Sequence, residues 1–278
     1  MENYTAHLSA AIAAALDAGR AIMAIYDAPD TDWGVERKAD NSPLTRADRE
    51  AHAIIARRLT EASSLPLLSE EGSHAPYAER SAWATLWLVD PLDGTKEFIK
   101  RNGEFTVNIA LVHEGEPVAG VVYAPATDTL YFGAQGAGAY RVERAAETAT
   151  TQWSELAGRG RRLPLGEPHE GFVVVASRSH PSPETEAFIA EARRLHGDVR
   201  TLASGSSIKI CLVAEGTADA YPRLAPTMEW DTAAADAVAR AAGARVAGAE
   251  SGAPLRYNKA DLHNPHFIVR RDAKSPQP

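Results

Sequence analysis

Four β-rich runs follow one another without an intervening helix, and this block most constrains the fold of the chain. Turns containing Gly or Pro separate the runs, which predicts a meander. Because strands and helices come in blocks and not in strict βαβ alternation, the sequence favours a layered α+β architecture. The predicted runs cover residues 106–112, 117–123, 129–134 and 138–142.

Helical patterns flank this block on both sides. The first predicted helix, 6–28, has an approximate 3.6-residue apolar period and ends at Pro29. The second, 45–61, begins with Thr45 as N-cap and Asp48 three residues later, which is capping-box spacing. Beyond the meander, the sequence predicts a strand at 172–176 and helices at 182–196, 206–215 and 230–242.

The chain has 278 residues, which is near the upper limit for one hydrophobic core. We expect a single unit of two packed halves, about 1–142 and about 171–272. The polar segment 143–170 is expected to be an irregular excursion, and 273–278 a tail.

Composition excludes several classes of protein. The net charge of −8 disfavours nucleic acid as a partner, because a polyanion is repelled unless the chain carries a basic patch. We find no run of about 18 apolar residues and therefore expect no transmembrane segment. A single cysteine, Cys211, rules out an internal disulfide framework, and we expect a cytoplasmic protein.

The most informative stretch runs from Trp87 to Thr95. An apolar run ends in Asp90-Pro91, and Pro91, which lacks an N–H, is expected to stop the strand. Asp93 follows closely, so both carboxylates can converge on one point. Gly94 and Thr95 then open a short helix, whose free N–H groups suit phosphate oxygens. Taken alone, this pattern is also typical of a capped turn.

Two further acids stand in similar settings. Glu70 and Glu71 follow the short apolar run 65–69, and Asp231 lies in the first turn of the predicted helix 230–242. Each has an ordinary structural interpretation, as a solvated loop acid or as a favourable charge at a helix start. Together with Asp90 they favour a site for hard divalent cations, which prefer oxygen ligands.

Groups suited to an anion appear in the second half. Ser206 and Lys209 lie at a predicted helix start, His180 follows a strand in a loop, and Arg223 follows a Tyr-Pro pair. Each also has an interpretation as a solvated surface residue, which is the more common one for a lone loop histidine such as His180, so the residues alone leave both interpretations open.

With these motifs assembled, the sequence resembles the lithium-sensitive, magnesium-dependent phosphatase superfamily that includes inositol monophosphatase and fructose bisphosphatase. The resemblance rests on 90–95 and 230–234 with Glu70-Glu71, and it covers nearly all of the chain except 143–170 and the tail. Within the superfamily it is closest to the bacterial 3′(2′),5′-bisphosphate nucleotidases, through 38–43, 96–111, 177–180 and 205–209. It implies a layered αβαβα sandwich, with a metal-binding first half and a substrate-binding second half.

The resemblance also implies a two-metal site. Glu70, Asp90 and the Leu92 carbonyl would hold one Mg²⁺, and Asp90, Asp93 and Asp231 a second. Four clustered carboxylates need such cations, because like charges at short range raise one another's pKa. Of these ligands, Glu70, Leu92, Asp93 and Asp231 are also expected to contact the substrate.

Catalytic roles follow in the same way. Gly94 and Thr95 would face the scissile phosphate, and Asp48 would pair with Thr95 to orient and deprotonate a water. Glu71 would hold outer-shell water. Gly72 departs from the family, in which a third acid often follows the Glu pair, and this leaves a third metal open.

The nucleotide pocket would be lined by His180, Ser206, Lys209 and Arg223. The implied reaction is hydrolysis of adenosine 3′,5′-bisphosphate to AMP and phosphate, with the sulfated analogue 3′-phosphoadenylyl sulfate as a further substrate, in sulfur metabolism. Inositol monophosphatase activity and a non-catalytic phosphate-ligand sensor remain as alternatives. The sequence leaves the oligomeric state and peripheral membrane association open.

Overall fold

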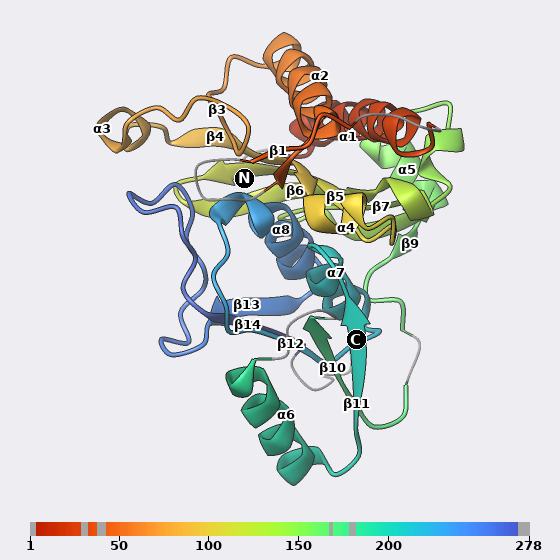
Figure 1. Ribbon diagram of the computed structural model, residues 1–278, viewed down its shortest axis with the longest axis vertical. Helices are drawn as coiled ribbons and strands as arrows, with labels where there is room; N and C mark the ends of the chain where they lie inside the picture. Colours follow the sequence, from red (N-terminus) through yellow and green to blue (C-terminus); the bar gives the residue numbers. More distant parts are fainter. Residues whose placement is uncertain (1–3, 29–32, 38–42, 167–168, 178–181, 272–278) are drawn as a thin grey trace.

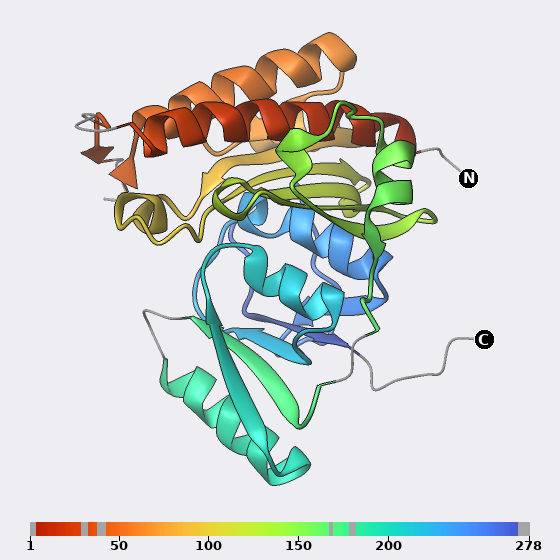
Figure 2. The ribbon, with the colours of Figure 1, turned by 90° about the vertical axis from the view of Figure 1, so that its right-hand side faces the viewer.

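The computed structural model describes residues 4–28, 33–37, 43–166, 169–177 and 182–271. These residues form five layers, as Figures 1 and 2 show. Helices α1 (Thr5–Tyr26) and α2 (Arg46–Ala62) cover one face of a large sheet. Helices α7 (Ile208–Glu215) and α8 (Ala233–Ala241) lie between that sheet and a smaller one, and α6 (Pro183–His196) covers the outer face. The layered αβαβα sandwich is therefore confirmed.

The large sheet contains the predicted meander. Within the described residues it has seven strands in the order β3-β4-β5-β6-β7-β8-β9, of which only β3 and β4 are parallel. The bounds are β3 (Leu67–Ser69), β4 (Thr85–Asp93), β5 (Thr106–His113), β6 (Glu116–Ala124), β7 (Thr129–Ala134), β8 (Gly138–Glu143) and β9 (Arg161–Arg162).

The smaller sheet has the order β11-β10-β12-β14-β13 in the described residues. Strand β10 is parallel to β11 and β12, whereas β14 is antiparallel to both of its neighbours. The bounds are β10 (Phe172–Ser177), β11 (Val199–Ser204), β12 (Ala220–Arg223), β13 (Ala244–Gly248) and β14 (Phe267–Arg271).

Short elements complete the described chain. They are β1 (Glu36–Arg37), β2 (Pro43–Leu44), α3 (Tyr77–Arg80), α4 (Thr95–Ile99), α5 (Trp153–Arg159), and the 3₁₀ helices η1 (Pro125–Thr127), η2 (Ala145–Glu147) and η3 (Glu229–Asp231).

Both faces of the large sheet are buried. Along β4, Trp87 and Val89 belong to the core beneath α1 and α2, whereas Leu86 and Leu88 belong to the core shared with α7 and α8. Helix α8 packs so closely that a Cβ added at Gly120 would lie 2.2 Å from the Ala234 carbonyl oxygen. Glycine is therefore needed there to seat the middle layer on the sheet.

Helix α1 is the one described helix that is long and apolar enough to span a membrane by length and composition. Its apolar side packs into the core, where Ile12 and Ile22 are fully buried. It also contacts α2 and β6, which is the behaviour expected of a core helix in a folded domain.

Three sequence predictions need correction. Strand β4 continues through Pro91 to Asp93, because a register shift between Asp90 and Asp93 accommodates the proline. The segment 143–170 is more regular than predicted, since it contains η2, α5 and β9. Asp231 lies in η3, one turn before α8, and not inside the long helix. The predicted tail lies outside the described residues.

Candidate active site

Strands β3 and β4 bring the first two acids together. The parallel register pairs Ser69 with Val89, and the Glu70 N–H donates to the Val89 carbonyl at 3.1 Å. Glu70 therefore lies beside Asp90 at the same end of the sheet. The Asp90 carboxylate accepts the Leu92 N–H at 3.0 Å and is only 1% exposed. The bulge at Pro91 thus folds the chain around a buried carboxylate.

A left-handed glycine follows the bulge. Gly94 has φ +94°, and an added Cβ would lie 3.0 Å from the Glu104 carbonyl oxygen. Both facts require glycine. The conformation allows α4 to begin at Thr95, only two residues after Asp93.

Asp231 approaches the same acids from the second half of the chain. Its carboxylate accepts the Met228 N–H at 2.9 Å, which fixes it at the end of η3. Burial, together with Asp93 and Glu70, raises the pKa of Asp231 to about 8. Burial also raises the pKa of Asp90 well above its usual value, with further contributions from Glu70, Asp93 and Asp231. These carboxylates are close enough to repel one another.

This donor set fits hard divalent cations. Repulsion among buried carboxylates is relieved by a cation, and oxygen-only ligands suit Mg²⁺. Within the described residues, no three His, Cys, Asp or Glu side chains are already arranged around a common metal position. The acids are therefore neighbours whose charges raise one another's pKa.

Asp48 and Thr95 are brought together from different elements. Asp48 lies in the first turn of α2 and is 1% exposed. One of its oxygens accepts the Thr45 N–H at 2.7 Å and the Thr45 hydroxyl at 2.5 Å. The other accepts the Thr95 hydroxyl at 3.1 Å. The capping box predicted from sequence is confirmed, and it also aims the second oxygen at Thr95.

Two further predicted residues, Glu71 and Leu92, interact with Asp48 and Thr95. The negative charge of Glu71 contributes to raising the pKa of Asp48, although burial is the larger cause. The Leu92 carbonyl oxygen lies 3.4 Å from the Thr95 hydroxyl oxygen and is a second, longer acceptor for the same hydrogen that Asp48 accepts at 3.1 Å. His180 falls in 178–181, outside the described residues, so its predicted place in the pocket stays a prediction.

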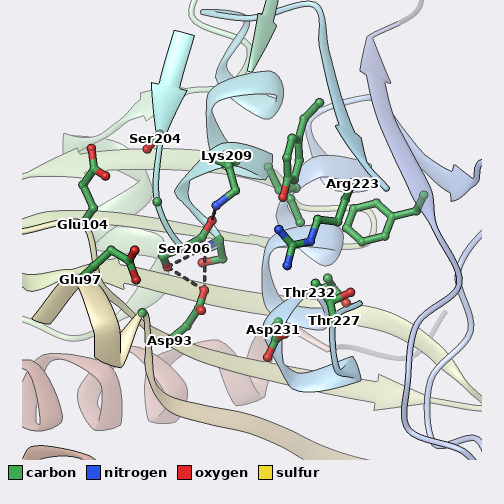
Figure 3. Close-up of a pocket in the computed structure, with 16 residues that line it drawn as sticks. Asp93, Glu97, Glu104, Ser204, Ser206, Lys209, Arg223, Thr227, Asp231 and Thr232 are labelled. Carbon is green, nitrogen blue, oxygen red and sulfur yellow. Dashed lines mark hydrogen bonds between the residues drawn. The ribbon is translucent and has the colours of Figure 1, made fainter. Parts of the chain in front are cut away.

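A cavity of about 180 Å³ opens beside Asp93 and Asp231. Figure 3 shows Lys209 and Arg223 on its far wall, facing these acids. Lys209 is 7% exposed and donates to the Ser206 carbonyl at 2.6 Å, so it is not a solvated helix residue. The Arg223 Nη2 donates to the Pro226 carbonyl at 2.9 Å, but its buried Nε finds no partner among the described residues.

Ser206 and Ser207 connect the two walls. The Ser206 hydroxyl and the Ser207 N–H each donate to one oxygen of Asp93 at 2.7 Å. Ser206 has φ +53°, an unusual backbone conformation for a residue other than glycine. The loop before α7 therefore holds Asp93 directly, whereas the sequence suggested only an anion contact for Ser206.

The sequence interpretation did not single out several lining residues. Glu97 and Glu104 face the cavity from the first half, and Tyr221 lies beneath Lys209, with the ring centroid 5.6 Å from Nζ. The two glutamates lie within residues 96–111, which carry part of the resemblance, so that stretch was the available signal. Thr227 also lines the cavity and had no sequence signal.

Comparisons with known proteins identify the family of the chain. The inositol monophosphatase family matches residues 3–275. A protein named 3′(2′),5′-bisphosphate nucleotidase CysQ from Escherichia coli K12 is 45% identical over 92% of this chain and 96% of its own length, and the CysQ of Shigella flexneri matches equally. Among solved structures, CysQ from Bacteroides thetaiotaomicron is 54% identical, with a TM-score of 0.89 over 98% of this chain and 99% of that one. An inositol monophosphatase from Anabaena shares the fold, with a TM-score of 0.67 and 24% identity over 97% of this chain and 92% of that one.

Proposed function

The chain belongs to the inositol monophosphatase family and is a phosphatase, and from this premise we propose that it hydrolyses adenosine 3′,5′-bisphosphate to AMP and phosphate. The relatives at 45% identity carry the name of this activity. We extend the proposal to 3′-phosphoadenylyl sulfate, to a role in sulfur metabolism and to a cytoplasmic location.

One observation carries the choice of substrate. The same cavity has carboxylates on one wall and two cationic side chains, Lys209 and Arg223, on the other. A phosphate held at the carboxylates through cations leaves Lys209 and Arg223 for a second anionic group. A substrate with two phosphates uses both walls, whereas inositol monophosphate has nothing to place at the second. A non-catalytic sensor is disfavoured because all the acids expected at the metal site are present.

The metal requirement is characteristic of the family, whose members depend on a metal ion, typically Mg²⁺. We propose that Glu70, Asp90 and the Leu92 carbonyl hold one ion, and that Asp90, Asp93 and Asp231 hold a second. When bound, these ions neutralise charge on the reacting phosphate and acidify the attacking water.

Asp48, Thr95 and Thr45 are the residues proposed to remove a proton from the attacking water. With its one hydroxyl hydrogen directed to Asp48, the nearer of its two acceptors, Thr95 has a lone pair that can accept a hydrogen bond from a water on the other side. Burial raises the pKa of Asp48, which makes the carboxylate a stronger base. Thr45 holds the remaining oxygen of Asp48, so the base does not rotate away. We propose that Asp48 receives the proton through Thr95.

Phosphate release from adenosine 3′,5′-bisphosphate and from inositol 1-phosphate, each with and without Mg²⁺, tests the proposal. We expect Mg²⁺-dependent release with a strong preference for the bisphosphate, and inhibition by added Li⁺. Equal rates on both substrates would return the assignment to inositol monophosphatase, and release that is indifferent to Mg²⁺ would remove the metal site.

Replacing Lys209 should separate the substrates. Lys209→Met keeps most of the buried stem and removes the charge. We expect KM for adenosine 3′,5′-bisphosphate to rise roughly 10- to 100-fold, because a charge-assisted contact is worth about 1.5–3 kcal/mol. KM for 3′-AMP should change little. Lys100→Met, at an exposed position just after α4, serves as the control. Equal losses on both substrates would assign Lys209 to structure.

The same residue predicts a pH dependence. Burial lowers the pKa of Lys209 from 10.5 to about 8, against an opposing effect of Asp93. The cation is therefore present below pH 8 and lost above it. We expect the ratio of kcat/KM for adenosine 3′,5′-bisphosphate to that for 3′-AMP to fall above about pH 8. The ratio cancels titration of Asp231, which affects both substrates. Lys209→Met should flatten this profile, and a limb that persists in the variant would contradict the assignment.

A further inference from the structure

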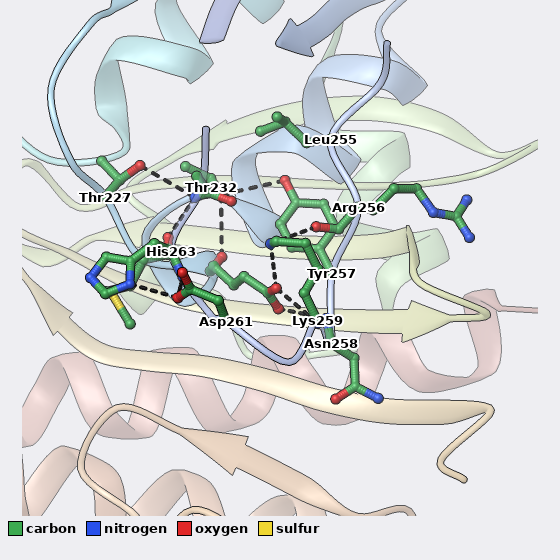
Figure 4. A network of polar contacts seen from close by, with 12 residues as sticks. Thr227, Thr232, Leu255, Arg256, Tyr257, Asn258, Lys259, Asp261 and His263 are labelled. Atoms are coloured by element: carbon green, nitrogen blue, oxygen red, sulfur yellow. Dashed lines mark hydrogen bonds and ion pairs between the residues drawn. The ribbon is translucent and has the colours of Figure 1, made fainter. Parts of the chain in front are cut away.

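A buried carboxylate that the proposed reaction does not use lies two residues before Asp231. Glu229 is 0% exposed and accepts the Asn258 N–H at 2.5 Å, the Lys259 N–H at 3.0 Å and the Lys259 ammonium at 2.5 Å. Figure 4 shows Tyr257, Asn258 and Lys259 following one another along a single loop, which we call the 257–259 loop. This loop therefore holds η3, the element that ends in Asp231.

The same loop binds the segment that carries Glu70. Arg80, at the end of α3, is 4% exposed and donates from Nη1 to Asn258 Oδ1 at 2.7 Å and to the Lys259 carbonyl at 3.1 Å. In return, Asn258 Nδ2 donates to the Arg80 carbonyl at 2.8 Å. Arg80 also donates to the Ala75 carbonyl at 3.0 Å. This bond connects the loop that follows Glu70 to α3, the helix that comes directly after that loop.

A third contact joins these two segments directly. The ring of His74 packs on Trp230, with centroids 5.2 Å apart, and its Nε2 lies 2.9 Å from the Ser69 carbonyl oxygen. Ser69 immediately precedes Glu70, and Trp230 immediately precedes Asp231. The backbone on either side of the acidic cluster is thus connected through side chains that do not belong to the cluster.

The contacts of the 257–259 loop indicate more than a connection between two strands. Burying an ionised carboxylate costs several kcal/mol unless it is paired and hydrogen-bonded, and Glu229 receives three donors, one of them charged. Asn258 adopts φ +61°, a left-handed conformation, so that its side chain meets Arg80. Such an arrangement persists only where the surroundings fix it.

We propose that the 257–259 loop is a positioning element for the metal site, which sets the separation of Glu70 and Asp231 and thereby the affinity for Mg²⁺. The inference rests on the proposed function, because it takes these two acids as ligands. Glu229, Asn258 and Lys259 touch neither substrate nor metal in this scheme. They act by holding the two segments that present the ligands.

Calorimetric titration with Mg²⁺ alone tests the proposal without relying on turnover. Lys259→Met removes the charge that pairs with Glu229, and Asn258→Gly removes the exchange with Arg80 while tolerating a positive φ. We expect each to weaken Mg²⁺ binding roughly 10-fold, the effect typical of partners that orient metal ligands. KM for the nucleotide at saturating Mg²⁺ should stay near that of the unmodified enzyme.

Two further variants make the result decisive. Arg141→Met also removes the cation partner of a buried glutamate, Glu215, at similar exposure, but far from the 257–259 loop in the chain. It should leave Mg²⁺ affinity unchanged, and Lys259→Arg should restore most of the affinity. The positioning role would be overturned if Lys259→Met and Asn258→Gly bound Mg²⁺ as tightly as Arg141→Met. Failure of the unmodified protein to bind Mg²⁺ would instead overturn the proposed function.

Discussion

Asp90→Asn is expected to lower kcat by roughly a thousandfold, about 4 kcal/mol of barrier, while making the metal-free protein more stable. Asp90 is the acid that both proposed metal positions share, so its loss weakens both. The fold should survive, because the amide oxygen of asparagine can still accept the Leu92 N–H. Steady-state kinetics at saturating Mg²⁺ checks the first effect, and thermal unfolding in EDTA checks the second.

The gain in stability follows from the sign of the pKa shift. Burial, assisted by Glu70 and the neighbouring aspartates, raises the pKa of Asp90 above its usual 3.8. Folding therefore disfavours the ionised form of Asp90. The resulting loss of folding stability appears as the pH rises above 3.8, the usual pKa of the group. The advantage of the variant should be absent below about pH 4 and should reach a few degrees in Tm at neutral pH.

Asp236→Asn provides a contrasting control. Asp236 is also fully buried, but it is paired with Arg240 at 2.7 Å and bound by the Tyr257 hydroxyl at 2.8 Å. The same substitution should lower the Tm there, because it leaves Arg240 without its counter-ion. Near-normal kcat in Asp90→Asn would exclude this residue as a ligand. If the Tm of metal-free Asp90→Asn fell instead, the charge of Asp90 would not be a source of instability in the metal-free protein.

Asp48→Asn should reduce kcat by roughly 10²- to 10⁴-fold with little change in KM, the range expected when a general base is removed. The amide cannot take the proton that Thr95 would pass on. The substitution is nearly isosteric, and the amide oxygen can still accept from Thr45. Rapid-quench or steady-state kinetics on adenosine 3′,5′-bisphosphate measures the loss.

Thr45→Ala separates catalysis from helix capping. It removes the side-chain half of the capping box, which should cost about 1 kcal/mol of unfolding free energy. The backbone N–H at position 45 and the Asp48 carboxylate remain in this variant, so kcat should fall far less than in Asp48→Asn. If the two variants lose activity equally, Asp48 serves mainly to start α2, and another group must be the base.

Local patterns in the sequence predict local structure well. Thr45 and Asp48 are three residues apart, and the capping box that they form follows from helix geometry alone. The meander was likewise readable, because each strand pairs with its neighbour in sequence. The strands of the smaller sheet beyond β10 are harder to predict, since they are short and, as in β14 between β12 and β13, pair with distant segments.

The candidate site depends on long-range contacts that no local pattern contains. Thr95 meets Asp48 across 47 positions, and Ser206 meets Asp93 across 113. Only the family resemblance predicted that the first pair would meet, and nothing predicted the second. Lys209 has the same local sequence whether it is solvated or buried, so its burial could be known only from the fold. Lys259 had no signal, because its partner Glu229 lies thirty residues away.

The order of the layers has a consequence for how this protein is made. Helices α7 and α8, which cover one face of the large sheet, are encoded after every strand of that sheet. A nascent chain that has emerged as far as Glu143 therefore presents Leu86, Leu88 and Val122 without their cover. During synthesis this apolar surface stays open until the chain has passed Ala241, and the interval is when the polypeptide is most exposed to aggregation and to chaperones.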